Sequence, residues 1–325
     1  MQRKRSSWTM ALLFAAFALI GYGPMAAAAD YPTARIEMVV HFAPGGPADI
    51  LGRALAEAVS PFLGQPVVVF NRPGASGTIG NTVVLGAKPD GYTILLDDNI
   101  ASVFQPMRLK LPYKGPQDFT PIIKVADSAN ALVVAADSKW KTLADFVADA
   151  KARPGALRVA TAGKFTGTDI NVVEFNKIAG IKTTTVPVSG GTGPSVVLLL
   201  GGHVEAIAAG AAAVVGQVHA GKLRVLTMFG KRRSPVFPDV PTATELGYKT
   251  TMTVMYFISA PKGLGKAERQ TLNAAFHKAL LTPKFEQFAK RNGYYIDALD
   301  PQALRKELDG WRVYFKNLSA ELGLK

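Results

Sequence analysis

Residues 41–53 read HFAPGGPADILGR, a glycine- and proline-rich stretch between two apolar segments. Before it, residues 36–42 form a β-branched and apolar run. After it, residues 50–62 carry apolar side chains at helical spacing, and Asp49 stands where a helix N-cap belongs. The stretch therefore predicts a strand, a tight turn and a helix.

The same order recurs along the chain. Further strands are predicted at residues 67–70, 93–96, 122–125, 131–135, 158–160 and 185–188, and helices at 77–85, 143–152, 169–179, 195–200, 266–280, 283–291 and 301–322. Strands that alternate with helices favour parallel sheets covered by helices on both faces. The predicted class is α/β.

A chain of this length is accommodated better by two lobes than by one. Residues 131–137 and 252–261 are apolar and extended, and we take them as the segments that cross between lobes. This predicts a discontinuous first lobe, residues 30–130 plus 255–325, and a second lobe, residues 131–254. Each lobe should hold a mostly parallel sheet, with a ligand cleft between them.

The first 29 residues have the pattern of a secretory signal peptide. Arg3, Lys4 and Arg5 precede an apolar run at residues 8–20, and four alanines end the segment before Asp30. The alternative is an uncleaved anchor, but the run is shorter than the roughly 20 apolar residues that a bilayer requires. We expect an exported protein that begins near Asp30.

Net charge and cysteine content exclude several functions. The formal charge of +13 falls to +10 without the signal, because three basic residues and no acids are removed. A positive protein attracts acidic ligands, but its Lys and Arg residues are scattered, which argues against nucleic acid as a partner. The absence of cysteine excludes disulfides, thiolate catalysis and thiolate metal sites.

Four glycine-rich turns follow or precede predicted elements, at residues 43–49, 72–80, 163–169 and 189–194. In open α/β sheets such turns present backbone N–H groups and the positive end of a helix dipole to a ligand. For any one of them, plain turn chemistry is the competing interpretation. Together they predict an anion held between the lobes.

Patterns for catalysis or a cofactor are missing. Ser76 has Gly74 before it but Thr78 after it, so no GxSxG elbow exists. The four histidines form no HExxH pattern, and GTIGNTVVLG is a poor dinucleotide fingerprint. We predict a binding protein with no catalytic residue, metal or cofactor. A secreted hydrolase is the weaker alternative, since no histidine lies in the glycine-rich turns.

Several blocks together resemble the Bug, or TctC-like, periplasmic solute receptors of tripartite tricarboxylate transporters. They are YPTARIEMVVHFAPGGPADILGR (31–53), VVVFNRPGASGTIGNTVVLGAKPDGYTILL (67–96), LPYKGPQDFTPI (111–122), GKLRVLTMFGKRRSPVFPDVPTATELGY (221–248) and APKGL (260–264). The resemblance implies a two-lobed periplasmic binding fold of type II, a periplasmic location and a small carboxylate ligand, such as a di- or tricarboxylate, an amino acid or an aromatic acid. It further implies delivery to two integral membrane subunits by a monomeric receptor. A sensory ligand-binding subunit is the alternative with the same fold.

The resemblance also implies which residues contact the ligand. The turns at 42–49 and 163–169 would hold one carboxylate, mainly through backbone N–H groups, and Thr192 stands in a further ligand-facing loop. The expected contacts are Phe42, Ala43, Gly45, Gly46, Pro47, Asp49, Asn99, Lys164, Phe165, Thr166, Thr168, Asp169, Ser189, Gly190, Gly191, Ala209 and Tyr256. For Asp49, a role as helix cap remains an equal alternative.

The sequence departs from the family pattern at three places. Ala209 stands where the family often has aspartate, and MYFISAP, with Met255 and Phe257, replaces a stretch similar to WFGLFAP. Asp97 and Asp98 stand where small hydroxyl residues are common. An acid aimed into the cleft would disfavour an anionic ligand, unless it faces solvent or caps the next element. The sequence therefore leaves the compound open.

Overall fold

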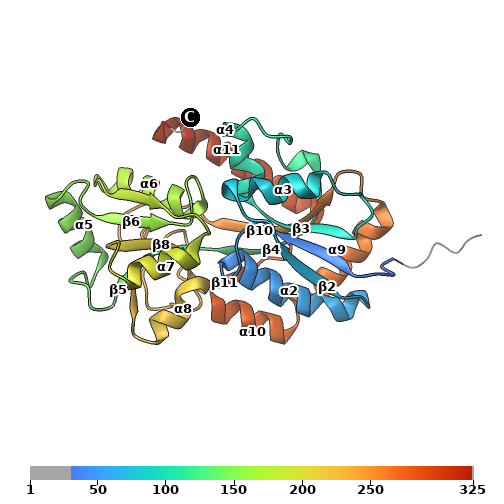
Figure 1. The fold of residues 1–325 in the computed structure, drawn as a ribbon, viewed down its shortest axis with the longest axis horizontal. Helices are drawn as coiled ribbons and strands as arrows, with labels where there is room; N and C mark the ends of the chain where they lie inside the picture. Colours follow the sequence, from blue (N-terminus) through green and yellow to red (C-terminus); the bar gives the residue numbers. More distant parts are fainter. Residues whose placement is uncertain (1–30, 324–325) are drawn as a thin grey trace, which may run out of the picture.

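The computed structural model describes residues 31–323, which form two sheets lying side by side along the long axis of the molecule (Figure 1). The predicted signal peptide, residues 1–29, lies outside the described residues. The α/β class with two helix-flanked sheets is confirmed. Both sheets are mixed rather than purely parallel.

The first sheet has the strand order β11-β4-β10-β3-β1-β2. Its strands are β1 (Ile36–Val40), β2 (Val67–Asn71), β3 (Thr93–Asp98), β4 (Phe119–Ser128), β10 (Val254–Pro261) and β11 (Tyr294–Ile296). β1 pairs in parallel with β2 and β3, whereas β10 runs antiparallel to β3 and β4. The turn quoted above therefore leaves the carboxyl end of a strand in the parallel part of this sheet.

Helices cover both faces of the first sheet. They are α2 (Pro47–Leu63), α3 (Thr78–Leu85), the short α4 (Gln105–Arg108), α9 (Lys266–Leu280), α10 (Pro283–Asn292) and α11 (Pro301–Leu322). In β1, Met38 and Val40 join the core formed with α2 and α9, while Val39 packs with Val84 of α3 on the other face. This alternation has the period of two that a strand requires, which is why both faces of β1 are apolar.

The second sheet has the order β7-β6-β8-β5-β9. Its strands are β5 (Asn130–Ala135), β6 (Arg158–Thr161), β7 (Thr184–Pro187), β8 (Ala206–Gly210) and β9 (Leu223–Met228), and its helices are α5 (Leu143–Ala152), α6 (Gly167–Ala179), α7 (Thr192–Leu200) and α8 (Ala211–His219). β6 is parallel to β7 and β8, and β5 is antiparallel to β8 and β9. One face packs on α5 and α6 and the other on α7 and α8.

The chain passes between the sheets twice. β4 ends at Ser128 and β5 begins at Asn130, so the first crossing is one residue long and precedes the predicted crossing segment at 131–137. The return lies after β9, and Val254 already pairs in the first sheet. These sheet memberships differ by one residue from the predicted lobe boundaries; the division into lobes that move relative to each other stays a prediction.

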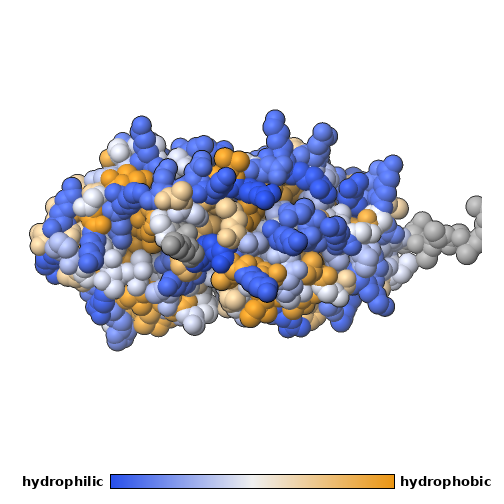
Figure 2. All heavy atoms as spheres, turned by 90° about the horizontal axis from the view of Figure 1, so that it is seen from above, coloured by the Kyte–Doolittle hydropathy of each residue, from blue (hydrophilic) through white to orange (hydrophobic). Residues whose placement is uncertain are grey.

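The face of the molecule that carries α4 and α11 is mainly polar (Figure 2). Seen from the side of α4 and α11, hydrophilic side chains predominate and hydrophobic ones form small separate patches (Figure 2). Among the helices of residues 31–323, none combines the length and hydropathy needed to cross a bilayer.

Candidate ligand-binding site

A cavity lies between the two sheets, where turns from both of them meet. It encloses about 490 Å³ of space not filled by atoms, part of which is open to solvent. Its walls are formed by Phe42, Ala43, Gly46, Pro47, Asp98, Asn130, Ala162, Thr166, Thr168, Gly190, Gly191, Thr192, Gly210, Val254 and Tyr256.

Four helices begin at this cavity. The N-cap residues of α2, α6, α7 and α8 are Gly46, Thr166, Gly191 and Gly210, and all four line its wall. None of the four caps its helix with a side-chain hydrogen bond. Helix N-termini carry partial positive charge and uncommitted N–H groups, so their convergence favours an anion. Lys and Arg are absent from the described wall.

Two of the turns close by the same device. The Asp49 carboxylate accepts the N–H of Gly45 at 2.9 Å, and the Asp169 carboxylate accepts the N–H of Phe165 at 2.8 Å. Each aspartate is the third residue of its helix, so Asp49 is not the N-cap that the sequence predicted; Gly46 is. The helices begin earlier than predicted because these side chains reach back over the turn to bond it.

The two threonine hydroxyls have different roles. Thr166 Oγ1 donates to the carbonyl of Gly163 at 2.8 Å, whereas Thr168 Oγ1 accepts the N–H of Ala162 at 2.9 Å. The two hydroxyls are 3.0 Å apart. Because a hydroxyl has one proton and Thr166 donates its proton to Gly163, Thr168 is the donor in the bond between the two hydroxyls. The Thr168 proton is therefore held by a neighbouring hydroxyl rather than by a backbone carbonyl.

The structure separates the predicted contact residues into three groups. Phe42, Ala43, Gly46, Pro47, Thr166, Thr168, Gly190, Gly191 and Tyr256 line the cavity. Lys164 and Ser189 line an adjoining pocket that shares Phe42, Ala43, Ala162, Gly190 and Gly191 with the cavity. Gly45, Asp49, Asn99, Phe165, Asp169 and Ala209 belong to neither wall. That the lining residues touch a ligand stays a prediction.

Ala209 is a correction. Its side chain is fully buried in the core between β8 and the helices α7 and α8. Successive strand residues point to opposite faces, so the assignment was one residue too early. The next residue, Gly210, lines the cavity.

Asn99 and Gly45 hold the backbone rather than lining the cavity. The Asn99 side chain donates to the carbonyl of Thr253 at 3.1 Å and accepts the N–H of Met255 at 3.0 Å, which fixes the returning chain beside β3. Gly45 has a φ of +81°, a left-handed conformation that favours glycine.

Phe165 joins the two halves of the molecule. The Arg108 guanidinium lies 3.3 Å from the centroid of its ring, and Gln105 donates to its carbonyl at 2.8 Å. Next to it, the carbonyl of Lys164 accepts a hydrogen bond of 2.7 Å from Ser76. These contacts connect the turn before α6 to segments that pack on the first sheet.

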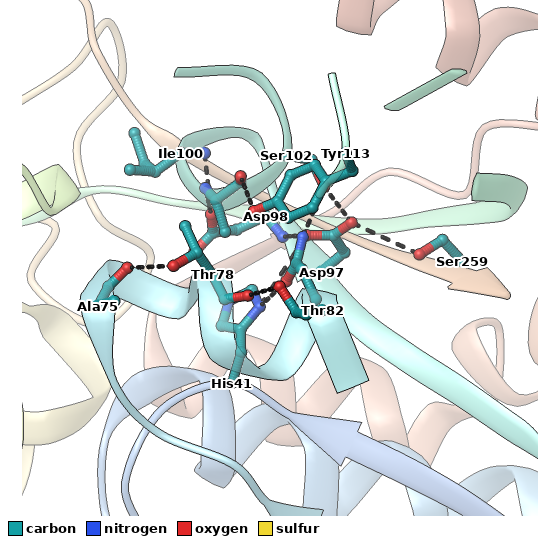
Figure 3. A network of polar contacts seen from close by, with 12 residues as sticks. His41, Ala75, Thr78, Thr82, Asp97, Asp98, Ile100, Ser102, Tyr113 and Ser259 are labelled. Carbon is teal, nitrogen blue, oxygen red and sulfur yellow. Dashed lines mark hydrogen bonds and ion pairs between the residues drawn. The ribbon is translucent and has the colours of Figure 1, made fainter. Parts of the chain in front are cut away.

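A buried polar network lies behind the cavity wall (Figure 3). Asp98 Oδ1 accepts the N–H groups of Ile100 and Ala101 at 2.8 and 2.7 Å, and Asp98 Oδ2 lies 3.2 Å from His41 Nε2. Asp97 accepts the side-chain N–H of Asn81 at 3.0 Å. Asp98 thus caps the helical segment η2 (Ile100–Phe104), as the sequence analysis allowed, and it also lines the cavity.

The geometry makes His41 an imidazolium. Asn81 donates through its NH₂ to Asp97 and Ser102, so its oxygen faces His41 Nδ1 at 3.0 Å and accepts a proton from it. The other ring nitrogen faces the Asp98 carboxylate. Burial lowers the pKa of His41, but Asp98, Asp97 and the hydrogen bonds outweigh burial and raise that pKa above 6.5. Burial raises the pKa of Asp97 to about 6.

The raised pKa of His41 predicts a loss of stability in alkali. The folded state holds this proton more tightly than the unfolded state, so its contribution is complete below pH 6.5 and is lost as pH rises through the folded pKa. We expect the free energy of unfolding of the wild type to fall across this window, and that of His41→Gln to fall less. Urea unfolding from pH 6 to pH 9 measures both, and parallel curves would contradict the assignment.

Several wall residues were not predicted. Asn130, Ala162, Gly210 and Val254 line the cavity but are absent from the predicted contacts. Gly210 had a readable signal, since it follows an apolar strand and precedes a helix, as Gly46 does. Asn130 and Val254 come from the crossings, where no local pattern marks a ligand.

Comparison with known proteins assigns the chain to a family. The sequence profile described as Tripartite tricarboxylate transporter family receptor matches residues 51–311. Protein BugT of Bordetella pertussis is 34% identical over 312 residues, which cover 94% of this chain and 95% of BugT.

Three solved structures are similar over most of the chain. The periplasmic binding protein BugD has a TM-score of 0.85 at 31% identity, over 91% of this chain and 99% of that chain. A protein of R. palustris with adipate has a TM-score of 0.86 at 25% identity, over 90% and 99%. MatC from Rhodopseudomonas palustris with bound malate has a TM-score of 0.81 at 27% identity, over 89% and 99%.

Proposed function

Because the chain belongs to the tripartite tricarboxylate transporter receptor family, we propose that it is a periplasmic solute receptor that binds a small organic carboxylate between two lobes. It acts as a monomer and delivers this ligand to the two membrane subunits of a transporter. Adipate and malate in two solved relatives are both small carboxylates, which supports the ligand class.

The observation that carries the proposal is the convergence of four helix N-termini on one cavity whose described wall holds no Lys or Arg. An anion there is held by N–H groups, the Thr168 hydroxyl and helix dipoles rather than by a salt bridge. Because α2 belongs to one lobe and α6, α7 and α8 to the other, binding draws the two lobes together.

A secreted hydrolase lacks a histidine base in the wall of this cavity. The chain has histidines at 41, 203, 219 and 277, and none of them lines the cavity. His41, the one nearest in sequence to the first turn, is fully buried between Asn81 and Asp98. An activated nucleophile needs a base within hydrogen-bond reach.

A panel of carboxylates tests the ligand class. Thermal unfolding is followed with mono-, di-, tri- and aromatic carboxylates, each paired with its neutral primary amide. A ligand at about 100 times its Kd adds about 2.7 kcal/mol to the free energy of unfolding. We expect at least one carboxylate, and no amide, to raise the unfolding temperature. Stabilisation by amides alone, or by no compound, would contradict the proposal.

The donors can be ranked by substitution. Thr168→Val removes a wall hydroxyl whose proton is given to the Thr166 hydroxyl and can turn to a bound ligand instead, and we expect it to weaken carboxylate binding by about 1 to 3 kcal/mol. Thr166→Val is the matched control and should cost less, because that hydroxyl already donates to Gly163. Lys164→Ala should also cost less, since this exposed side chain lies outside the cavity. Calorimetric titration compares the three; a Lys164→Ala loss above that of Thr168→Val would mean that a salt bridge holds the ligand.

A further inference from the structure

We propose that Asp98 determines ligand specificity: it accepts a hydrogen bond from a hydroxyl or ammonium group of the ligand, so the receptor selects hydroxy- or amino-substituted carboxylates over unsubstituted ones. The inference rests on the proposed function and goes beyond it by naming the substrate class. Asp98 is the acidic side chain in the described wall of the cavity.

One oxygen of Asp98 has an accepting position left. Oδ1 already accepts two N–H groups, from Ile100 and Ala101, which use both of its lone pairs. Oδ2 faces His41 Nε2 alone, so one of its two lone pairs is not used by the protein. Since the side chain borders the cavity, a hydrogen-bond donor of the ligand occupies the remaining lone pair of Oδ2.

The surrounding network keeps Asp98 an acceptor. Both nitrogens of His41 face acceptors, so the ring is an imidazolium and supplies the counter-charge to the Asp98 carboxylate. An ionised carboxylate accepts hydrogen bonds and donates none. A second carboxylate of the ligand placed against it would be repelled, whereas a hydroxyl or ammonium group would be bound.

The capping of η2 does not explain an acid at this position. Asn, Ser and Thr cap helices as well as Asp does, without a charge. Here the carboxylate lies in the wall of a cavity on which four helix N-termini converge, 3.2 Å from the ring of His41 buried behind it. The Asp98–His41 pair thus places a charged acceptor beside an anion site that is otherwise made of donors.

Tyr256 lies on the strand next to Asp98. It is the direct partner of Asp98 in the pairing of β10 with β3, and it lines the same cavity. Burial, and in addition the Asp98 charge, raise the pKa of the Tyr256 phenol, so that group stays neutral. A ligand bound here meets one neutral phenol and one carboxylate on adjacent strands.

Matched ligands test the selectivity. Calorimetric titrations compare succinate with malate and aspartate, and adipate with 2-aminoadipate, on the wild type, Asp98→Asn and Asp97→Asn. Asn at position 98 keeps an oxygen for the η2 cap and removes the charge. Asp97→Asn removes an equal charge at the neighbouring position, and the Asp97 side chain does not line the cavity.

We expect the wild type to bind a donor-bearing member at least tenfold more tightly than its unsubstituted partner. Asp98→Asn should reduce this ratio to near one, and Asp97→Asn should leave it tenfold or more. An equal affinity within every pair in the wild type, or a ratio unchanged by Asp98→Asn, overturns the inference while the receptor function stands. Absence of binding by every carboxylate overturns both.

If Asp98→Asn does not fold, Asp98→Ser, which also caps η2, decides in its place. A preference for malate, for aspartate or for both identifies the donor as hydroxyl, ammonium or either.

Discussion

Gly210→Val is expected to weaken carboxylate binding roughly 100-fold. A Cβ at this position would lie 2.7 Å from Cγ and 3.3 Å from Cβ of Pro47, in the turn of the opposite lobe. The backbone of Gly210, with φ −65° and ψ 142°, suits any L-residue, so the substitution should not strain β8 or α8. It acts by keeping the two walls of the cavity apart.

A matched control lies in the same helix. Gly216 of α8 has no heavy atom within 4 Å of a built Cβ, so Gly216→Val should leave the affinity within about twofold of the wild type. Calorimetric titration of both variants with the best carboxylate gives the comparison. Equal affinities for Gly210→Val and the wild type would mean that the ligand does not require Pro47 and Gly210 in contact.

Lys124→Met is expected to lower the free energy of unfolding at pH 7 by about 3 to 5 kcal/mol. Lys124 is 1% exposed, and its ammonium group contacts Asp127 at 3.0 Å, Asp297 at 2.8 Å and Glu307 at 2.7 Å. Burial lowers the pKa of Lys124, but the three acids outweigh burial and raise it. Methionine fills the space of the lysine stem and leaves three carboxylates without their cation.

An exposed ion pair is the control for this prediction. Lys284 and Glu57 lie 2.6 Å apart with side chains 85% and 69% exposed, so Lys284→Met should cost at most about 1 kcal/mol. Urea unfolding at pH 7 compares the two variants, and the Lys124→Met penalty should shrink at pH 4 as carboxylates are protonated. A penalty no larger than that of Lys284→Met would show that the buried cluster is energetically neutral.

The order of strands and helices was predictable because it depends on local periodicity. The period of two in β1 and the helical spacing of α2 are both set within a few residues of the turn at 41–53. The convergence of the glycine-rich turns followed from a general rule, since ligands gather at the carboxyl ends of parallel strands. Neither inference needed a long-range contact.

Which side chains face the cavity was less predictable. At the end of β8, Ala209 is buried in the core, whereas the next residue, Gly210, lines the cavity. An error of one residue along the strand therefore exchanges a core residue for a wall residue. Asp49 and Asp169 were expected at the ligand, but they accept hydrogen bonds from the turns beside the cavity. The contact between Asp98 and His41 joins residues that are 57 positions apart in the sequence, so no local pattern reveals the pair.

The proposed function requires that neutral donors from both lobes bind a carboxylate in the cavity. Calorimetric titration of the wild-type protein with the best carboxylate of the panel, and with the same compound converted to its primary amide, tests this claim most directly. We expect one-to-one binding of the carboxylate, with the amide at least 100-fold weaker, because helix N-termini favour the anion. Equal affinity for the amide, or no binding of either compound, would contradict this claim.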